Sequence, residues 1–204
     1  MTIQVNVMSY KYGHLVAHCI ESLLAQTRKP DVIKVFDDGA GDCKHLKTIY
    51  PEIELIERSE NIGIVKNFDD ALKNHTYADK VMFLGADNWL RPDALDLLSK
   101  VDADVVTYDI VVTGEYKYEI TRRHPHQIRE SRGDYYWDRS EGHHGSMLYS
   151  VDFGKRAGYS SPPGRTVEDL VLYNKMLQLG ATRKHIHEAL LFYRRHRDNF
   201  NSVK

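Results

Sequence analysis

The sequence has 204 residues, of which 42% are hydrophobic and 28% are charged, a composition typical of a globular domain with its own core. Its 28 basic and 29 acidic side chains give a net charge of -1, which argues against a general nucleic-acid binder because such proteins need an excess of cations. The two cysteines are not closely spaced, and no segment is long and apolar enough to span a bilayer. We therefore expect a cytoplasmic protein without a transmembrane segment, with peripheral contact to a membrane left open.

The first 112 residues alternate between predicted strands and predicted helices. Apolar or alternating segments predict strands at 3–7, 32–36, 53–56, 81–84 and 105–112. Hydrophobic residues at helical spacing predict helices at 14–24, around 68–72 and at 92–98. This order predicts an α/β fold, with a mostly parallel central sheet that carries helices on both faces.

The pattern becomes less regular after residue 112. We expect a hairpin at 114–123, a strand at 145–150, a helix at 168–179 and an apolar strand or helix end at 189–193. The length fits one domain, and no low-complexity linker divides the chain. We therefore predict a single domain over residues 1–204, with a regular half (1–112) and a small irregular half (113–204).

Polar side chains follow three of the predicted strands. Ser9 and Tyr10 follow the first strand, Asp37 and Asp38 the second, and Asp87 the fourth. Ligands bind beyond the carboxyl ends of the strands in such sheets, so these side chains are expected to converge. Tyr10 offers a ring for stacking on a base, Asp38 offers hydrogen-bond acceptors, and Asp87 suits a hard cation that also binds phosphates. Taken alone, Asp38 and Asp87 are more often ordinary turn or helix-capping residues.

Two cationic positions could face a diphosphate. Lys66 lies just inside a predicted helix, where a lone lysine is most often solvated. His196 lies among three arginines near the end of the chain and could bind a metal or a diphosphate, or belong to a solvated basic tail. The sequence alone leaves these alternatives open.

Acidic residues and histidines in the second half are candidates for the chemistry. Glu168 and Asp169 begin a predicted helix, a position that favours acidic side chains in any protein. Asp169 could instead accept a proton from an attacking hydroxyl group. His144 and Gly145 could line the pocket of an acceptor, although histidines are common surface residues.

Several segments, taken in order, resemble motifs of the family 2 inverting glycosyltransferases of the GT-A fold. Segment 8–11 resembles their P-T-Y-N loop, segment 35–42 their V-V-D-D-G-S-x-D motif and segment 61–63 their N-x-G motif. Segment 20–27, I-E-S-L-L-A-Q-T, is highly characteristic of their first helix. Segment 84–92 resembles the L-D-A-D-D motif with its metal-binding D-x-D, except that Gly85 replaces the first aspartate and Asn88 the last.

The second half also resembles this family. Glu168 and Asp169 resemble the E-D pair, segment 144–147 resembles the acceptor-side segment before it, and segment 192–199 resembles a Y-R-x-H-x-x-N close. The resemblance implies that Tyr10 and Asp38 hold the base and that Lys66 stands where a diphosphate-side arginine is common. It further implies that Asp87 binds the metal, that His196 reaches metal or phosphate, and that Asp169 is the catalytic base.

We therefore predict an enzyme that transfers a sugar with inversion from a nucleotide diphosphate donor, with a UDP-sugar favoured, to an acceptor hydroxyl. The expected cofactor is Mn²⁺ or Mg²⁺. Residues 1–112 would bind the nucleotide, and residues 113–204 would face the acceptor. Two alternatives are a catalytically weak or inactive nucleotide-sugar-binding module of the same fold and a sugar-phosphate nucleotidyltransferase. A glycan, a lipid-linked or a protein acceptor, and a homo-oligomer, are all left open.

Overall fold

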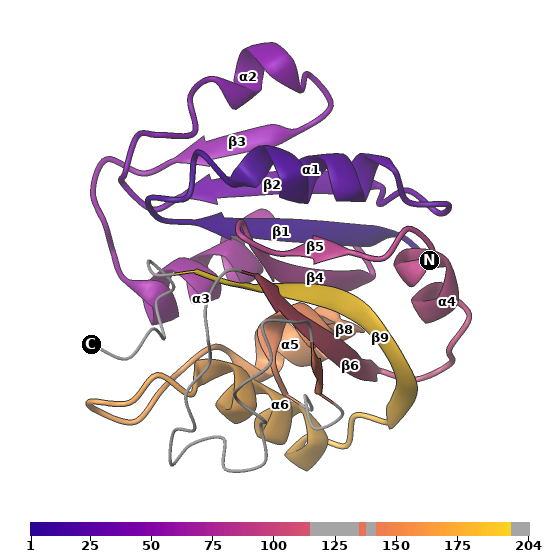
Figure 1. The fold of residues 1–204 in the computed structure, drawn as a ribbon. Coiled ribbons are helices and arrows are strands. Elements are labelled where there is room, and N and C mark those ends of the chain that lie inside the picture. The colour runs from indigo at the N-terminus through magenta and orange to yellow at the C-terminus, as the bar shows by residue number, and fades with distance from the viewer. Residues whose placement is uncertain (115–134, 138–141, 197–204) are drawn as a thin grey trace.

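The computed structural model describes residues 1–114, 135–137 and 142–196 (Figure 1). Its strands are β1 (Ile3–Ser9), β2 (Val32–Asp37), β3 (Glu54–Glu57), β4 (Lys80–Gly85), β5 (Trp89–Leu90), β6 (Val105–Gly114), β7 (Tyr135–Trp137), β8 (Met147–Ser150) and β9 (Arg183–Arg195). Its α-helices are α1 (Val16–Leu24), α2 (Leu46–Ile49), α3 (Ile64–His75), α4 (Ala94–Ser99), α5 (Val151–Ala157) and α6 (Glu168–Gln178).

All strands of the described residues belong to one sheet, in the order β3-β2-β1-β4-β8-β6-β9-β5, with β7 paired to β6. The part formed by β3, β2, β1 and β4 is parallel, as the alternation of strands and helices predicted. The second half adds antiparallel pairs of β8 with β4 and with β6, whereas β9 runs parallel to β6. The sheet is therefore mixed, with parallel pairs among β3, β2, β1 and β4 and a further parallel pair of β6 and β9.

Helices cover both faces of the sheet, and each face has its own hydrophobic core. Helices α1, α2 and α4 pack on one face, where α1 contributes Val16, Ile20 and Leu23. Helices α3, α5 and α6 pack on the other face, where Phe68 and Leu172 are among the buried residues. Figure 1 shows these two layers on either side of the strands. The predicted α/β class is confirmed.

Strand β1 is buried on both faces because it lies in the interior of a sheet that helices cover on both sides. Its polar residues are therefore paired inside the protein. The Gln4 amide donates to Asn6 Oδ1 (2.7 Å) and to the carbonyl of His75 (2.8 Å), and the Asn6 amide donates to Thr76 Oγ1 (2.8 Å). These bonds satisfy polar groups that would otherwise be costly to bury.

The elements of the irregular half carry the predicted site residues His144, Glu168 and Asp169. The predicted strand at 145–150 is a short 3₁₀ turn (His144–Ser146) followed by β8. The apolar segment 189–193 is the last part of the long strand β9, and the predicted hairpin at 114–123 lies almost wholly outside the described residues. None of the helices in the described ranges combines the length and apolar character that a membrane span requires.

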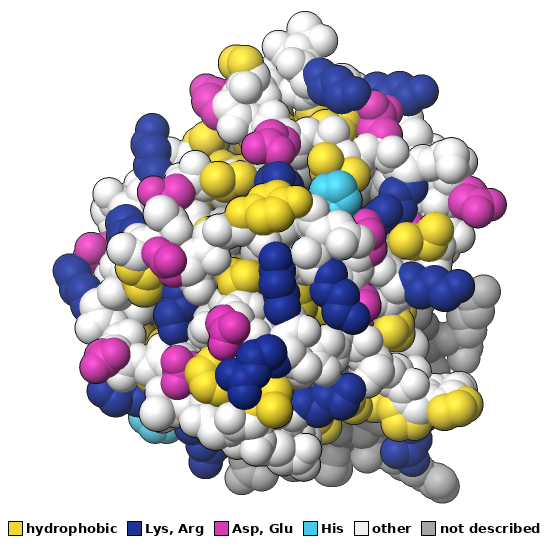
Figure 2. Space-filling model, turned by 180° about the vertical axis from the view of Figure 1, so that it is seen from behind, with side chains coloured by type: hydrophobic (Ala, Val, Ile, Leu, Met, Phe, Trp, Pro, Cys, Tyr) yellow, Lys and Arg dark blue, Asp and Glu magenta, His cyan; other side chains and the backbone are white. Residues whose placement is uncertain are grey.

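The face opposite to the view of Figure 1 carries basic and acidic side chains intermingled, with hydrophobic side chains in small separate areas (Figure 2). This distribution agrees with the balanced counts of basic and acidic residues in the sequence.

Candidate active site

A cleft of about 660 Å³ lies beyond the carboxyl ends of the parallel strands. One wall comes from the loops that follow β1, β2 and β4, which contribute Tyr10, Asp38 and Asp87. The other wall comes from the segment before β8 and from the start of α6, which contribute His144 and Asp169. The cleft thus joins residues from both halves of the chain, and its place follows from the direction of the parallel strands.

The first part of the wall, which we call the base wall, consists of Ser9, Tyr10 and Asp38. The Asp38 amide donates to the Ser9 carbonyl (2.9 Å), and Asp38 Oδ1 accepts from the Ile62 amide (3.1 Å). Arg58 Nε lies 3.7 Å from the same oxygen. Tyr10 is 42% exposed, so its ring offers an open face beside a fixed carboxylate. This pair can stack on a base and accept hydrogen bonds from its edge.

The glycine after Asp38 is required by the fold of this loop. Gly39 has a φ of +80°, and a Cβ at this position would lie 2.2 Å from the carbonyl carbon of Glu60. The loop after β2 therefore packs directly on the backbone that leads to Asn61 and Gly63, which also line the cleft. The D-D-G segment thus joins two neighbouring loops of the base wall.

Two of the predicted nucleotide-binding residues do not line the cleft. Asp37 is 1% exposed, and its carboxylate accepts from the amides of Ala40 (2.9 Å), Gly41 (3.1 Å) and Cys43 (3.2 Å). Asp37 therefore shapes the loop, and its placement gives no support to a contact with nucleotide. Lys66 is exposed on α3, outside the residues that form the wall, and its contact with a diphosphate stays a prediction.

Asp87 and His196 lie side by side, although 109 residues separate them. His196 Nε2 is 3.2 Å from Asp87 Oδ2, and the two side chains are 13% and 7% exposed. Arg194 of β9 holds the loop in place, because its amide donates to Asn88 Oδ1 (2.9 Å) and its Nε donates to the Asp87 carbonyl (3.0 Å). His196 does not itself line the cleft, but it lies beside Asp87, which does. A carboxylate and an imidazole so placed fit a divalent cation such as Mn²⁺, whose other ligands would be phosphate and water.

Gly85 provides the space for the Asp87 carboxylate. A Cβ at residue 85 would lie 2.7 Å from Asp87 Oδ1 and 2.8 Å from Asn88 Nδ2, both closer than real Cβ contacts. An aspartate at this position would force the Asp87 side chain into another place. The glycine that replaces the first aspartate of the D-x-D motif therefore allows the Asp87 carboxylate to take its observed position.

We expect Gly85→Ala to fold normally but to weaken the response to Mn²⁺ by roughly 10–100-fold in apparent affinity, a range typical of changes next to a metal ligand. The reason is that the added methyl group displaces the flexible end of Asp87 and not the backbone. A Mn²⁺ titration in the presence of UDP, with the thermal unfolding midpoint as the readout, measures this apparent affinity. Equal titration curves for the variant and the wild type would contradict the role of Gly85, and the midpoint without metal is the control for folding.

The opposite wall, which we call the acid wall, is formed by Glu168 and Asp169 in the first turn of α6. Asp169 is half-buried, and its Oδ1 accepts from the amide of Leu170 (2.7 Å). Glu168 is 4% exposed, and its Oε1 lies 3.3 Å from His144 Nε2. Among the described residues, Oε2 of Glu168 has no hydrogen-bond partner. A buried carboxylate oxygen at a cleft is a ready acceptor for a ligand hydroxyl.

The two histidines before β8 are held in fixed positions beside the acid wall. The ring of His144 packs on that of Phe68, with centroids 4.2 Å apart, and His143 Nδ1 accepts from the amide of Gly145 (3.2 Å). Burial lowers the pKa of His143 below its usual value, while the nearby Asp169 carboxylate opposes the change. His143 is therefore a neutral side chain at physiological pH.

The sequence prediction missed several residues of the cleft wall, among them Tyr12, Asn67 and Tyr193. Asn67 is 3% exposed and accepts from Arg58 Nε (2.8 Å), so it positions the arginine that also approaches Asp38. It lies one helical turn after Gly63, and this spacing is the only signal in the sequence that could have found it. Tyr12 lies beside His196, with ring centroids 5.4 Å apart, and Tyr193 lies beside His143, with ring centroids 5.3 Å apart.

Comparison with solved structures identifies the fold. The structure resembles S. aureus TarS 1-349 with a TM-score of 0.71 and 17% identity, over 95% of this chain and 60% of that chain. For TarS 1-349 in complex with UDP the TM-score is 0.71, with 16% identity over 98% of this chain and 62% of that chain. For the complex with UDP-GlcNAc it is 0.69, with 16% identity over 96% and 59%. The mixed sheet with its two helical layers is a GT-A fold.

The sequence match is to the family described as Glycosyl transferase family 2, over residues 5–159. The chain therefore belongs to glycosyltransferase family 2, as its motifs predicted. It is 28% identical to glycosyltransferase GlyA of Streptococcus pneumoniae serotype 4 over 140 residues, which are 66% of this chain and 18% of GlyA. The chain thus spans less than a fifth of GlyA and about 60% of TarS 1-349.

Proposed function

We propose that this chain is an inverting glycosyltransferase that uses a UDP-sugar and a divalent metal. The observation that carries the proposal is that the base wall, Asp87 and the acid wall face one cleft of about 660 Å³, with His196 directly beside Asp87. That volume suits a nucleotide sugar, because pockets for small ligands fall in the range of roughly 300–1,000 Å³. TarS, which has the same fold, has been solved with UDP and with UDP-GlcNAc, and this supports uridine as the base.

The donor would lie along the cleft from the base wall to the side chains of Asp87 and His196. Tyr10 would stack on the base, and the Asp38 carboxylate would accept a hydrogen bond from its edge. Asp87 and His196 would hold Mn²⁺ or Mg²⁺ beside the diphosphate, and the cation would stabilise the negative charge on the leaving group. Its two protein ligands, a carboxylate and an imidazole, favour Mn²⁺ over Mg²⁺.

The acceptor would approach from the side of α6. Asp169 would take the proton from the acceptor hydroxyl as that oxygen forms its bond to the anomeric carbon of the sugar. The bond from this carbon to the diphosphate breaks at the same time, and UDP leaves from the opposite face, so the configuration is inverted. Glu168 would accept a hydrogen bond from a sugar hydroxyl through Oε2, with His144 fixing its other oxygen.

The test is a panel of nucleotide sugars, each added with Mn²⁺ or with EDTA. For each one, the thermal unfolding midpoint and the release of free nucleotide are measured. We expect one or a few UDP-sugars to raise the unfolding midpoint only when Mn²⁺ is present, because a ligand that binds only the folded state stabilises it. The same donors should release UDP slowly without an acceptor. Stabilisation without any release would favour a nucleotide-sugar-binding module, an alternative that the loss of one motif aspartate at Gly85 keeps open.

A sugar-phosphate nucleotidyltransferase would behave differently in this panel. It would consume a nucleoside triphosphate and a sugar phosphate and release pyrophosphate, which a parallel assay detects. We propose the cytoplasm as the place of action. The acceptor class can be determined once the donor is known. Acceptor screening with glycans, lipid-linked sugars and proteins is the next step.

A further inference from the structure

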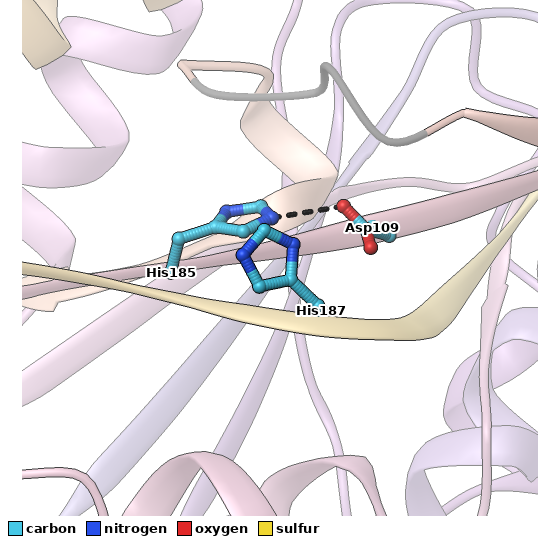
Figure 3. Close-up of side chains that lie close together, drawn as sticks. All are labelled: Asp109, His185 and His187. Carbon is cyan, nitrogen blue, oxygen red and sulfur yellow. Dashed lines mark hydrogen bonds and ion pairs between the residues drawn. The ribbon is translucent and has the colours of Figure 1, made fainter.

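A second cluster of metal-binding side chains lies on strands β6 and β9, away from the cleft. Figure 3 shows Asp109 of β6 and His185 and His187 of β9 pointing toward one another. One ligand atom from each residue lies within 4.8 Å of those of the other two. None of the three residues lines the cleft of the candidate active site.

The cluster is partly built into the sheet and partly open to solvent. Asp109 is 1% exposed and the His185 side chain is 14% exposed, whereas His187 is exposed. His185 Nε2 is 2.9 Å from Asp109 Oδ1, and His185 Nδ1 is 2.8 Å from Thr107 Oγ1. Both nitrogens of the His185 ring are thus fixed, and His187 can move toward the pair from the solvent side.

A register shift in the pairing of β6 and β9 lies directly at this cluster. Thr107 pairs with His185 and Tyr108 with Ile186, but Asp109 pairs with Ala189. His187 and Glu188 are therefore extra residues in a β-bulge, and such bulges redirect side chains next to functional sites. An unbroken register would pair His187 with Asp109; the bulge takes His187 off the ladder, and its ring still lies near the buried carboxylate.

We propose that Asp109, His185 and His187 bind one zinc ion, with water as the fourth ligand. Two imidazoles and a carboxylate are a donor set that zinc accepts, whereas Mg²⁺ and Ca²⁺ prefer oxygen ligands alone. Bonds of about 2.0–2.2 Å place tetrahedral ligands roughly 3.4 Å apart, so only small side-chain movements are needed. The open side at His187 leaves room for the water.

The hydrogen bond to Thr107 supplies the support that a ligating histidine requires. Without metal, the proton of a neutral His185 lies on Nε2 and is donated to Asp109. Zinc takes the place of this proton, which moves to Nδ1 and is then donated to the Thr107 hydroxyl, so the ring stays neutral. Ligating histidines usually donate their second nitrogen in this way. The alternative is a structural Asp–His pair that binds no metal.

The test is zinc binding to the chelator-treated chain of residues 1–204, measured by calorimetry, in an Asp87→Asn background that removes the cleft carboxylate from competition. We expect one zinc per chain. His187→Ala should weaken the affinity at least tenfold, and Thr107→Val should weaken it roughly 10–100-fold, as changes next to a metal ligand do. His45→Ala, which removes another exposed histidine, is the matched control and should bind zinc like its parent.

His187 is exposed, so its replacement leaves the fold intact, and circular dichroism checks this. Cobalt provides an independent measurement on the parent protein, because its absorption bands in the visible range report tetrahedral nitrogen and oxygen ligands. Equal zinc affinity in the parent and in His187→Ala would overturn the proposal. So would the absence of zinc binding in the parent, which would leave Asp109 and His185 as a structural pair. Neither outcome bears on the donor cleft.

Discussion

Asp169→Asn is expected to lower the rate of sugar transfer by about 10²–10⁴-fold, the usual contribution of a general base, while UDP and Mn²⁺ bind as before. The amide has nearly the shape of the carboxylate and can still accept from the Leu170 amide, but it cannot take the proton of the acceptor. Asp169 belongs to the wall opposite Asp87 and the base wall, so donor binding does not depend on it. Initial rates of UDP release and a UDP titration measure the two effects separately.

The matched control for this variant is Asp152→Asn. Asp152 also lies in the first turn of a helix, but its side chain is 73% exposed and pairs with Arg156 on the same helix. We expect this control to keep the wild-type rate. If Asp169→Asn transferred sugar at the wild-type rate, another group would have to be the base.

Asp87→Asn is expected to remove the dependence on Mn²⁺ and to lower the transfer rate on the order of 10²-fold or more, as the loss of electrostatic stabilisation of a leaving group does. An amide keeps the size of the side chain and its hydrogen bonding with His196, but it carries no charge for a cation. The stabilisation by UDP that Mn²⁺ promotes should disappear as well. Thermal unfolding with UDP, with and without Mn²⁺, measures this directly.

Asp93→Asn serves as the comparison, because Asp93 follows the same segment of chain but forms an exposed ion pair with Arg91 outside the cleft. It should leave the response to Mn²⁺ unchanged. A wild-type rate and an unchanged Mn²⁺ response in Asp87→Asn would refute the metal site at Asp87. Removal of metal by EDTA from the wild type should reproduce the loss of rate.

The positions of Ser9, Asp38 and Asp87 at one cleft could be predicted from the sequence. Each follows a predicted strand, and the direction of parallel strands places their ends together whatever the side chains are. Asp37 was also predicted there, but an aspartate beside a glycine-rich loop can equally bind backbone amides, as it does. Order along the chain fixes the place of a loop, but not which of two adjacent carboxylates points into the cleft.

Contacts between distant strands could not be derived from the sequence pattern. The contact of His196 with Asp87 joins positions 109 residues apart. Each residue was predicted separately as a possible metal ligand, but nothing in the sequence pattern placed one beside the other. The cluster of Asp109, His185 and His187 gave no signal, because it depends on which residue of β9 pairs with which residue of β6 and on a register shift between them. A shift of one residue turns a side chain to the other face of a sheet, and hydrophobic periodicity does not report bulges.

The place of β9 inside the sheet has a consequence for how the protein is made. β9 follows β6 in the chain only after many intervening residues, yet it pairs with β6 from Val105 to Gly114. It carries Arg194, which contacts Asn88, and leads directly to His196, which contacts Asp87. While the chain emerges from the ribosome, one side of β6 therefore stays without its partner until residues 183–195 have been synthesised. Such an open strand invites pairing with other chains. We expect a chain that stops before residue 183 to aggregate and to lack the contact between Asp87 and His196.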